Sequence, residues 1–176
     1  RDVASAFVES TTFGGESWLA HISFLSGTAV RDQNTNVRLM AQERDTLAKA
    51  FKRRGYRTVT IMPGLQRGWP EGAFYGFDRI YGAFDLEYGE RPPFGWWSIT
   101  DQYALSLVDK REEAPTDRQP VFIFFPTITS HAPFTPAPPY QPDWDRVVSW
   151  RPYDATDLDL AWAEPPDWTN LSPSYV

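Results

Sequence analysis

Cysteine is missing from this sequence altogether. Disulfide bonds, thiol nucleophiles and cysteine-ligated zinc sites are therefore excluded. Positively charged residues are also few. The chain has 17 Lys and Arg residues against 23 Asp and Glu residues, which gives a formal net charge of −6. That balance argues against a nucleic-acid-binding surface. No apolar run approaches the roughly 20 residues that a membrane-spanning helix needs.

Aromatic residues and prolines are abundant instead. Aromatics make up 16% of the 176 residues, with 8 Trp, and there are 16 Pro. This composition predicts ordered, proline-braced loops packed with rings, which either line a pocket for a bulky or sugar-like ligand or serve packing alone. The length suits a single domain over residues 1–176. Because the chain opens on Arg1 without a methionine, we expect it to be a piece of a longer protein.

Hydrophobic periodicity predicts an alternation of strands and helices. The expected strands are 3–9, 57–62 and 120–125, with a short extended segment at 77–81, and the expected helices are 17–26, 42–54 and 99–111. Residues 28–41 read as polar and irregular, and residues 143–176 as an irregular tail with a short helix at 157–163. With right-handed crossovers, this order predicts a three-layer α/β/α sandwich around a mostly parallel sheet.

The first strand and the residues after it form the most informative stretch. Val3–Glu9 reads as a buried strand that ends in a carboxylate at the mouth of the sheet, where ligands bind in such folds. A loop containing Gly14 and Gly15 leads to Ser17 at the start of a helix, where backbone N–H groups favour an anion. The alternative is a plain strand–loop–helix connection in which Ser17 is only the helix N-cap.

The sequence has only two histidines, and each has a functional and a structural interpretation. His21 lies one helical turn beyond Ser17, where it either contacts the serine or a substrate oxygen, or is a partly buried helix residue. His131 follows the last strand and is a candidate donor to an oxyanion. Trp69 either stacks on a sugar or lipid head group or packs within its loop.

Two common catalytic motifs are missing. The nucleophile elbow G-x-S-x-G of serine hydrolases does not occur, because Ser17 is followed by Trp18 and Leu19. No Walker motif and no G-x-G-x-x-G fingerprint is present. A metal-independent serine esterase therefore remains an alternative, although the sequence lacks the G-x-S-x-G motif that is usual for that class of enzyme.

Several motifs in order resemble the sulfatase-like branch of the alkaline phosphatase superfamily. They are Phe7–Ser10, Gly15–His21, Ser26–Gly27, Gly76–Asp78 and Thr127–Phe134. Within that branch, lipoteichoic acid synthases and phosphoethanolamine transferases are the most similar in pattern, and the resemblance covers residues 3–142. It implies an alkaline phosphatase-like fold and a metal-dependent phosphoryl or sulfuryl transferase or hydrolase.

The resemblance also implies roles for individual residues. Glu9 would be a metal ligand, and Ser17 would be both a ligand and the nucleophile. The cofactor would be one divalent ion, either Mn, Zn, Mg or Ca. His131, Trp69 and His21 would bind the substrate, a small-molecule, lipid or glycan phosphodiester or sulfate ester. The parent protein would be membrane-anchored, with this domain extracytoplasmic, on the periplasmic or cell-surface face of the inner membrane.

The sequence departs from the family pattern at several positions. Ser17 replaces the threonine of the transferases, Leu19 and His21 replace the Pro and Arg of the sulfatase signature, and Glu71 replaces an arginine. No Asp-His dipeptide occurs, although the family takes two further metal ligands from one. We therefore expect the remaining ligands beyond Val176 and weak metal binding by this chain alone. A non-catalytic domain that binds glycans or anionic lipids on the same fold is the competing function.

Overall fold

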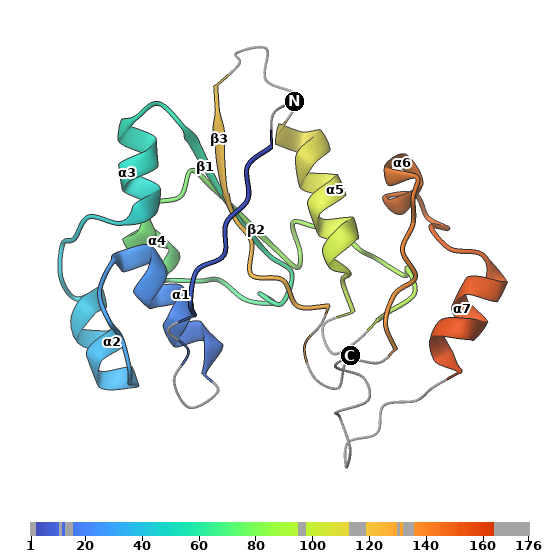
Figure 1. Ribbon diagram of the computed structural model, residues 1–176, viewed down its shortest axis with the longest axis horizontal. Helices are drawn as coiled ribbons and strands as arrows, with labels where there is room; N and C mark the ends of the chain where they lie inside the picture. Colours follow the sequence, from blue (N-terminus) through green and yellow to red (C-terminus); the bar gives the residue numbers. More distant parts are fainter. Residues whose placement is uncertain are drawn as a thin grey trace.

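The computed structural model describes residues 3–10, 12, 16–94, 98–112, 119–129, 131 and 136–163. Three parallel strands form its sheet, in the order β2–β1–β3 (Figure 1). They are β1 (Arg57–Met62), β2 (Arg79–Gly82) and β3 (Val121–Phe124). The helices are α1 (Ser17–Ser26), α2 (Gln33–Met40), α3 (Leu47–Arg53), α4 (Gly72–Tyr75), α5 (Asp101–Glu112), α6 (Trp144–Val147) and α7 (Ala155–Trp162).

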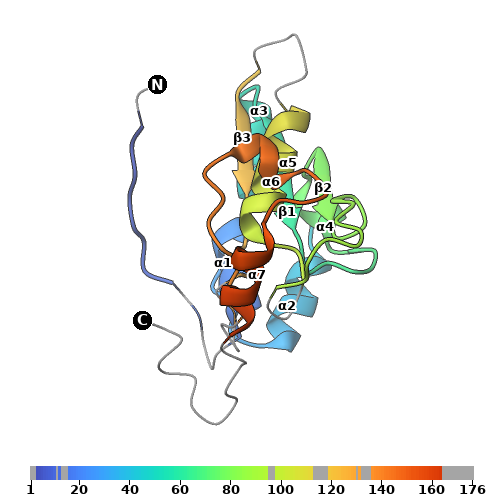
Figure 2. The same cartoon turned by 90° about the vertical axis from the view of Figure 1, so that its right-hand side faces the viewer.

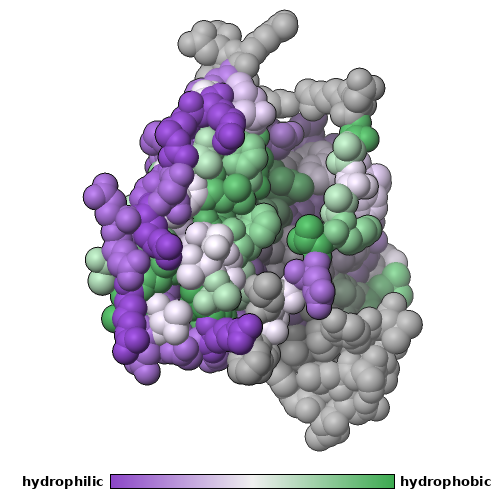
Figure 3. Space-filling view, turned by 60° about the vertical axis from the view of Figure 1, so that its left-hand side comes forward, coloured by the Kyte–Doolittle hydropathy of each residue, from purple (hydrophilic) through white to green (hydrophobic). Residues whose placement is uncertain are grey.

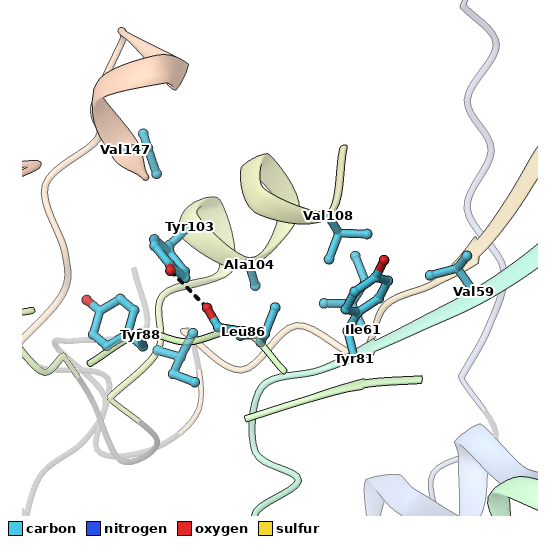
Figure 4. Close-up of a cluster of buried hydrophobic side chains, with 10 residues drawn as sticks. Val59, Ile61, Tyr81, Leu86, Tyr88, Tyr103, Ala104, Val108 and Val147 are labelled. Carbon is cyan, nitrogen blue, oxygen red and sulfur yellow. Dashed lines mark hydrogen bonds between the residues drawn. The ribbon is translucent and has the colours of Figure 1, made fainter. Parts of the chain in front are cut away.

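Helix α5 covers one face of the sheet. The apolar residues of β1 that point to this side, Val59 and Ile61, are fully buried against Ala104 and Val108 of α5 (Figure 4). At the far end of this cluster, the hydroxyl of Tyr103 donates a hydrogen bond of 2.9 Å to the backbone carbonyl of Leu86. A buried phenol retains a partner in this way, so the helix can bury a large ring without leaving a polar group unpaired.

Helices α1 and α3 cover the opposite face. Phe122 of β3 stacks on Phe51 of α3, with ring centroids 4.2 Å apart. Phe124, the next residue with the same orientation along the strand, contacts His21 of α1 edge-on. The fold is therefore an α/β sandwich with helices on both sides of a parallel sheet, as the sequence predicts.

Some helices and strands have the predicted boundaries, and others begin or end at different residues. Strand β1 and helix α1 have the predicted limits, and α1 ends because Gly27 adopts a left-handed conformation with φ of 63°. Helix α3 starts five residues later than expected. It starts at Leu47 because the Thr46 side chain caps it, accepting a hydrogen bond of 3.2 Å from the backbone N–H of Lys49.

Residues 28–41 are not irregular, contrary to the prediction. Helix α2 occupies most of this range and begins after Asp32, whose carboxylate accepts a 2.9 Å hydrogen bond from the backbone N–H of Thr35. Asp32 is therefore the N-cap of α2. The sequence did not predict this cap, because the polar composition of the segment suggested a loop. Leu39 and Asn36 are the buried residues of the helix.

The prediction of a buried strand at Val3–Glu9 is wrong for this structure. Residues 3–10 are extended but belong to no strand, and all are exposed, including Phe7 and Val8. The segment runs beside the open edge of β3, in the same direction, yet stands away from it (Figure 2). A strand needs a neighbour for its backbone N–H and carbonyl groups, and within the described residues β3 pairs with β1 alone.

The predicted irregular tail is partly helical. Helix α6 buries Val147 in the same core as α5. Helix α7 begins at a capping box formed by Asp154 and Asp157, two residues before the short helix expected at 157–163, and ends one residue before it. Residues 164–176 lie outside the described part of the chain. Among the helices that the structure describes, none is long and apolar enough to cross a membrane.

Candidate functional site

A cavity of about 340 Å³ lies at the carboxyl ends of β1 and β3. Met62 and Phe124, the last residues of those two strands, form part of its wall. The described residues that line it are Trp18, His21, Ile22, Leu25, Gln33, Asn36, Met62, Trp69, Glu71, Tyr75 and Phe124. The carboxyl edge of a parallel sheet is the expected position for a ligand site in this class of fold.

Helix α1 supplies one side of this cavity. Trp18, His21, Ile22 and Leu25 recur at the spacing that places side chains on one helix face. Ile22 and Leu25 are buried and anchor the helix, whereas Trp18 and His21 are half-buried and border the hollow space.

His21 is the polar group of that face. Its ring meets the edge of Phe124 with centroids 5.8 Å apart and an interplanar angle of 78°. Burial lowers the pKa of the His21 imidazole, because a charged ring loses solvation beside apolar neighbours. The imidazole is therefore neutral at pH 7, with one nitrogen donating and the other accepting.

Trp69 forms the opposite side, together with Tyr75. The two rings stack with centroids 5.2 Å apart and an interplanar angle of 25°. Gly72 permits this arrangement, because a Cβ there would lie 2.6 Å from Cδ1 of Ile80 and 3.1 Å from the Trp69 ring. Burial, followed by the negative charge of Glu71, raises the pKa of the Tyr75 phenol, which stays protonated.

Helix α2 closes the cavity with Gln33 and Asn36, two residues that sequence reasoning missed. Asn36 is only 6% exposed, and its Oδ1 has no hydrogen-bond partner among the described residues. The cap of α2, Asp32 with Thr35, was the available signal for this helix. Sequence alone does not reveal that α2 packs against the carboxyl edge of the sheet.

Glu9 lies at a neighbouring cavity rather than at this one. A second hollow of about 350 Å³ is lined by Glu9 and Val8 from the extended segment, by Phe24 of α1 and by Phe124. His21 lines both cavities and so lies between them. In Figure 3 an apolar patch lies at the centre of the surface, with hydrophilic residues along its left-hand border.

Ser17 is exposed and is the first residue of α1. It is not the N-cap, because Glu16 occupies that position and its side chain makes no capping hydrogen bond. The Glu16 side chain therefore satisfies none of the backbone N–H groups of the first helical turn. Ser17 lines neither of the two cavities above.

His131 is exposed in the loop after β3, and its backbone N–H donates a 2.9 Å hydrogen bond to the carbonyl of Ile128. The loop is anchored to α5, since the carboxylate of Asp101 accepts hydrogen bonds of 2.9 Å from the backbone N–H groups of Ile128 and Thr129. His131 lines neither cavity. The structure thus brings His21 together with Trp69 in one cavity and with Glu9 in the other.

No group of three or more His, Asp or Glu side chains that would hold a metal occurs in the described part of the chain. Glu9 and Ser17 are oxygen donors of the kind that Mg²⁺, Mn²⁺ and Ca²⁺ prefer. Two such donors are fewer than these ions require, so these residues fit a metal only as part of a larger ligand set.

The family model described as Sulfatase matches residues 20–154 of this chain. A search of curated proteins finds no significant match. Among solved structures, the lipoteichoic acid synthase LtaP from Listeria monocytogenes is similar with a TM-score of 0.53 and 17% identity. The match covers 71% of this chain and 31% of LtaP.

A second similar structure is a protein in the alkaline phosphatase superfamily from Vibrio parahaemolyticus, with a TM-score of 0.46 and 19% identity. The match covers 79% of this chain and 36% of that protein. This chain therefore spans about a third of the length of either structure. At this level of identity the similarity to LtaP concerns the fold.

Proposed function

The chain belongs to the sulfatase family, and we propose that it carries the nucleophile of a phosphoryl or sulfuryl transferase or hydrolase. The observation that supports this most directly is the exposure of Ser17 at the start of α1, without a capping side chain from Glu16. Backbone N–H groups at such a helix start stabilise negative charge on a transferred group. The two glycines that precede Glu16 in the sequence favour close approach of a substrate.

In the proposed reaction, the hydroxyl oxygen of Ser17 attacks phosphorus or sulfur. A bond forms between that oxygen and the central atom, the bond to the leaving oxygen breaks, and the serine proton passes to water or to the leaving group. Water or an acceptor hydroxyl then attacks the modified serine and restores it. His131 would donate to the non-bridging oxygens, while His21 and Trp69 would hold the rest of the substrate.

Members of this superfamily generally use a divalent metal. We propose that Glu9 and Ser17 contribute two oxygen ligands to one such ion, chosen among Mn, Zn, Mg and Ca. Bound there, the ion would lower the pKa of the serine hydroxyl and offset charge on the substrate. Residues other than those described would complete the ligand set.

The substrate that we propose is a small-molecule, lipid or glycan phosphodiester or sulfate ester. We also propose an extracytoplasmic position and a membrane anchor in the protein to which this domain belongs. Family membership supports the extracytoplasmic position, since sulfatase-family domains of this kind are typically extracytoplasmic.

The test is turnover of bis-p-nitrophenyl phosphate and p-nitrophenyl sulfate by the intact protein with each of the four metals. Ser17→Ala should abolish turnover, Ser17→Thr should retain part of it, and Ser5→Ala is the matched control at an exposed serine. Mass spectrometry should find the phosphoryl or sulfuryl group on Ser17. Full activity of Ser17→Ala would refute the nucleophile assignment.

A non-catalytic domain that binds glycans or anionic lipids is the second candidate. Its specific support is the aromatic lining of the first cavity, which Trp18, Trp69, Tyr75 and Phe124 form. The same assay separates the two, because a binding domain gives no turnover with any of the metals. Labelling of Ser17 by a fluorophosphonate in the presence of a chelator would instead indicate a metal-independent serine esterase.

A further inference from the structure

The cavity between α1, α2 and Trp69 has an unusual balance of charge for a protein that handles anionic esters. Among its described lining residues, Glu71 is the only one with a formal charge at neutral pH. No lysine or arginine is part of that lining. His21 adds no positive charge at pH 7, because burial lowers its pKa.

We propose that this cavity binds a primary ammonium group carried on a short apolar stem. The proposal concerns the cavity alone and does not rest on Ser17 being a nucleophile. It requires three things of the site: negative charge, aromatic faces and an acceptor for an N–H donor.

Glu71 supplies the negative charge. It is exposed, so it lies where an entering ligand meets the solvent, and its charge raises the pKa of the neighbouring Tyr75 phenol. An isolated phosphate or sulfate would be repelled by this carboxylate, whereas an ammonium would be attracted. Charge therefore selects a cation at this position.

The rings of Trp18, Trp69, Tyr75 and Phe124 supply the aromatic faces. A cation within about 6 Å of the centroid of a tryptophan ring is attracted by the electron density of its face. The same rings remove the apolar stem of the ligand from water. The remaining lining residues of α1, Ile22 and Leu25, extend this apolar surface.

Asn36 supplies the acceptor. Its side chain lines the cavity, is 94% buried, and carries an Oδ1 without a hydrogen-bond partner among the described residues. A buried acceptor left unpaired costs about 1–3 kcal/mol, which a ligand donor recovers. A primary ammonium has three N–H donors, and a quaternary ammonium has none.

The test titrates this chain with three ligands that each carry an unbranched alkyl chain, while tryptophan fluorescence reports on Trp18 and Trp69. The ligands are n-butylammonium, the uncharged 1-pentanol and butyltrimethylammonium, which lacks N–H donors. We expect n-butylammonium to bind about tenfold more tightly than 1-pentanol. We expect butyltrimethylammonium to bind more weakly than n-butylammonium. Equal affinity for n-butylammonium and 1-pentanol, or no binding of n-butylammonium at millimolar concentration, would overturn the proposal.

Two variants test whether Glu71 and Asn36 cause the preference for n-butylammonium. Glu71→Gln should reduce n-butylammonium affinity about tenfold and leave 1-pentanol affinity unchanged. Glu43→Gln, at an exposed carboxylate outside the cavity lining, is the control and should change neither. Asn36→Leu should remove the preference for n-butylammonium over butyltrimethylammonium. Because Glu71 is exposed, its substitution leaves the core intact, and unchanged n-butylammonium affinity in that variant refutes the site.

Discussion

The imidazole of His21 meets Phe124 edge-on, with ring centroids 5.8 Å apart, and this contact joins helix α1 to the carboxyl end of β3. His21 thereby separates the cavity that holds Trp69 from the one that Glu9 lines. Two residues that lie 103 positions apart in the numbering of the sequence thus define the centre of the candidate site.

Stability should depend on pH through His21. Burial lowers the pKa of His21 in the folded state, so the unfolded chain binds a proton more readily than the folded one. The stabilising contribution is present above the unfolded-state pKa near 6.5 and is lost as the pH falls through the folded-state value. Urea unfolding between pH 7.5 and 5.5 (roughly one unit on either side of the unfolded-state pKa) should show this decline.

His21→Gln is the control for this prediction. The variant should lose the part of the pH dependence that His21 causes, and NMR titration of the wild-type ring should give a pKa below 6.5. An NMR pKa for His21 above 6.5 would contradict the assignment, because it would mean that the charged ring is stabilised by its surroundings.

Glu112 at the end of α5 should be important for stability. Its carboxylate accepts hydrogen bonds from Arg57 of β1 and, at 2.7 Å, from the hydroxyl of Tyr81 of β2, and its side chain is only 5% exposed. Glu112→Gln should lower the free energy of unfolding at pH 7 by about 1–3 kcal/mol, because the partly exposed Arg57 guanidinium and the buried Tyr81 lose a charged acceptor. Chemical denaturation measures this, with the exposed Glu43→Gln as the control.

The difference between wild type and Glu112→Gln should also depend on pH. Burial raises the pKa of the Glu112 carboxyl, but the hydrogen bonds from Arg57 and Tyr81 outweigh burial and hold the pKa below its ordinary value. The stabilisation is therefore present above the unfolded-state pKa and lost as the pH falls through the folded-state value. A difference that stays constant from pH 7 to pH 3 (roughly from above to below the ordinary glutamate pKa) would argue against the ion pair.

The backbone amides of residues 3–9 should be unprotected against hydrogen exchange in this chain. Because its residues are exposed and belong to no strand, its backbone amides should exchange with deuterium at rates close to those of an unfolded peptide. The amides of β1, which pairs on both sides, are the internal reference and should exchange most slowly. Protection of residues 3–9 equal to that of β1 would show that the strand expected from the sequence does form.

Local signals predicted some elements well and failed at others for identifiable reasons. Helix α1 has its predicted limits because Gly27 adopts the left-handed conformation that ends a helix. Helix α2 was missed because its apolar face is narrow, although Asp32 caps it. Sequence reasoning placed Trp69 and His21 near a substrate, and both line the same cavity.

The sequence by itself determined the parallel α/β class, the limits of β1 and α1, and the order of motifs typical of the sulfatase family, because each depends on residues close together in the chain. Only the tertiary structure decided that residues 3–9 stand apart from the sheet, since pairing depends on which strand edge is open to them. It also decided that Asn36 and Glu71 share one cavity. Such a cavity depends on how separate helices pack, which no local pattern encodes.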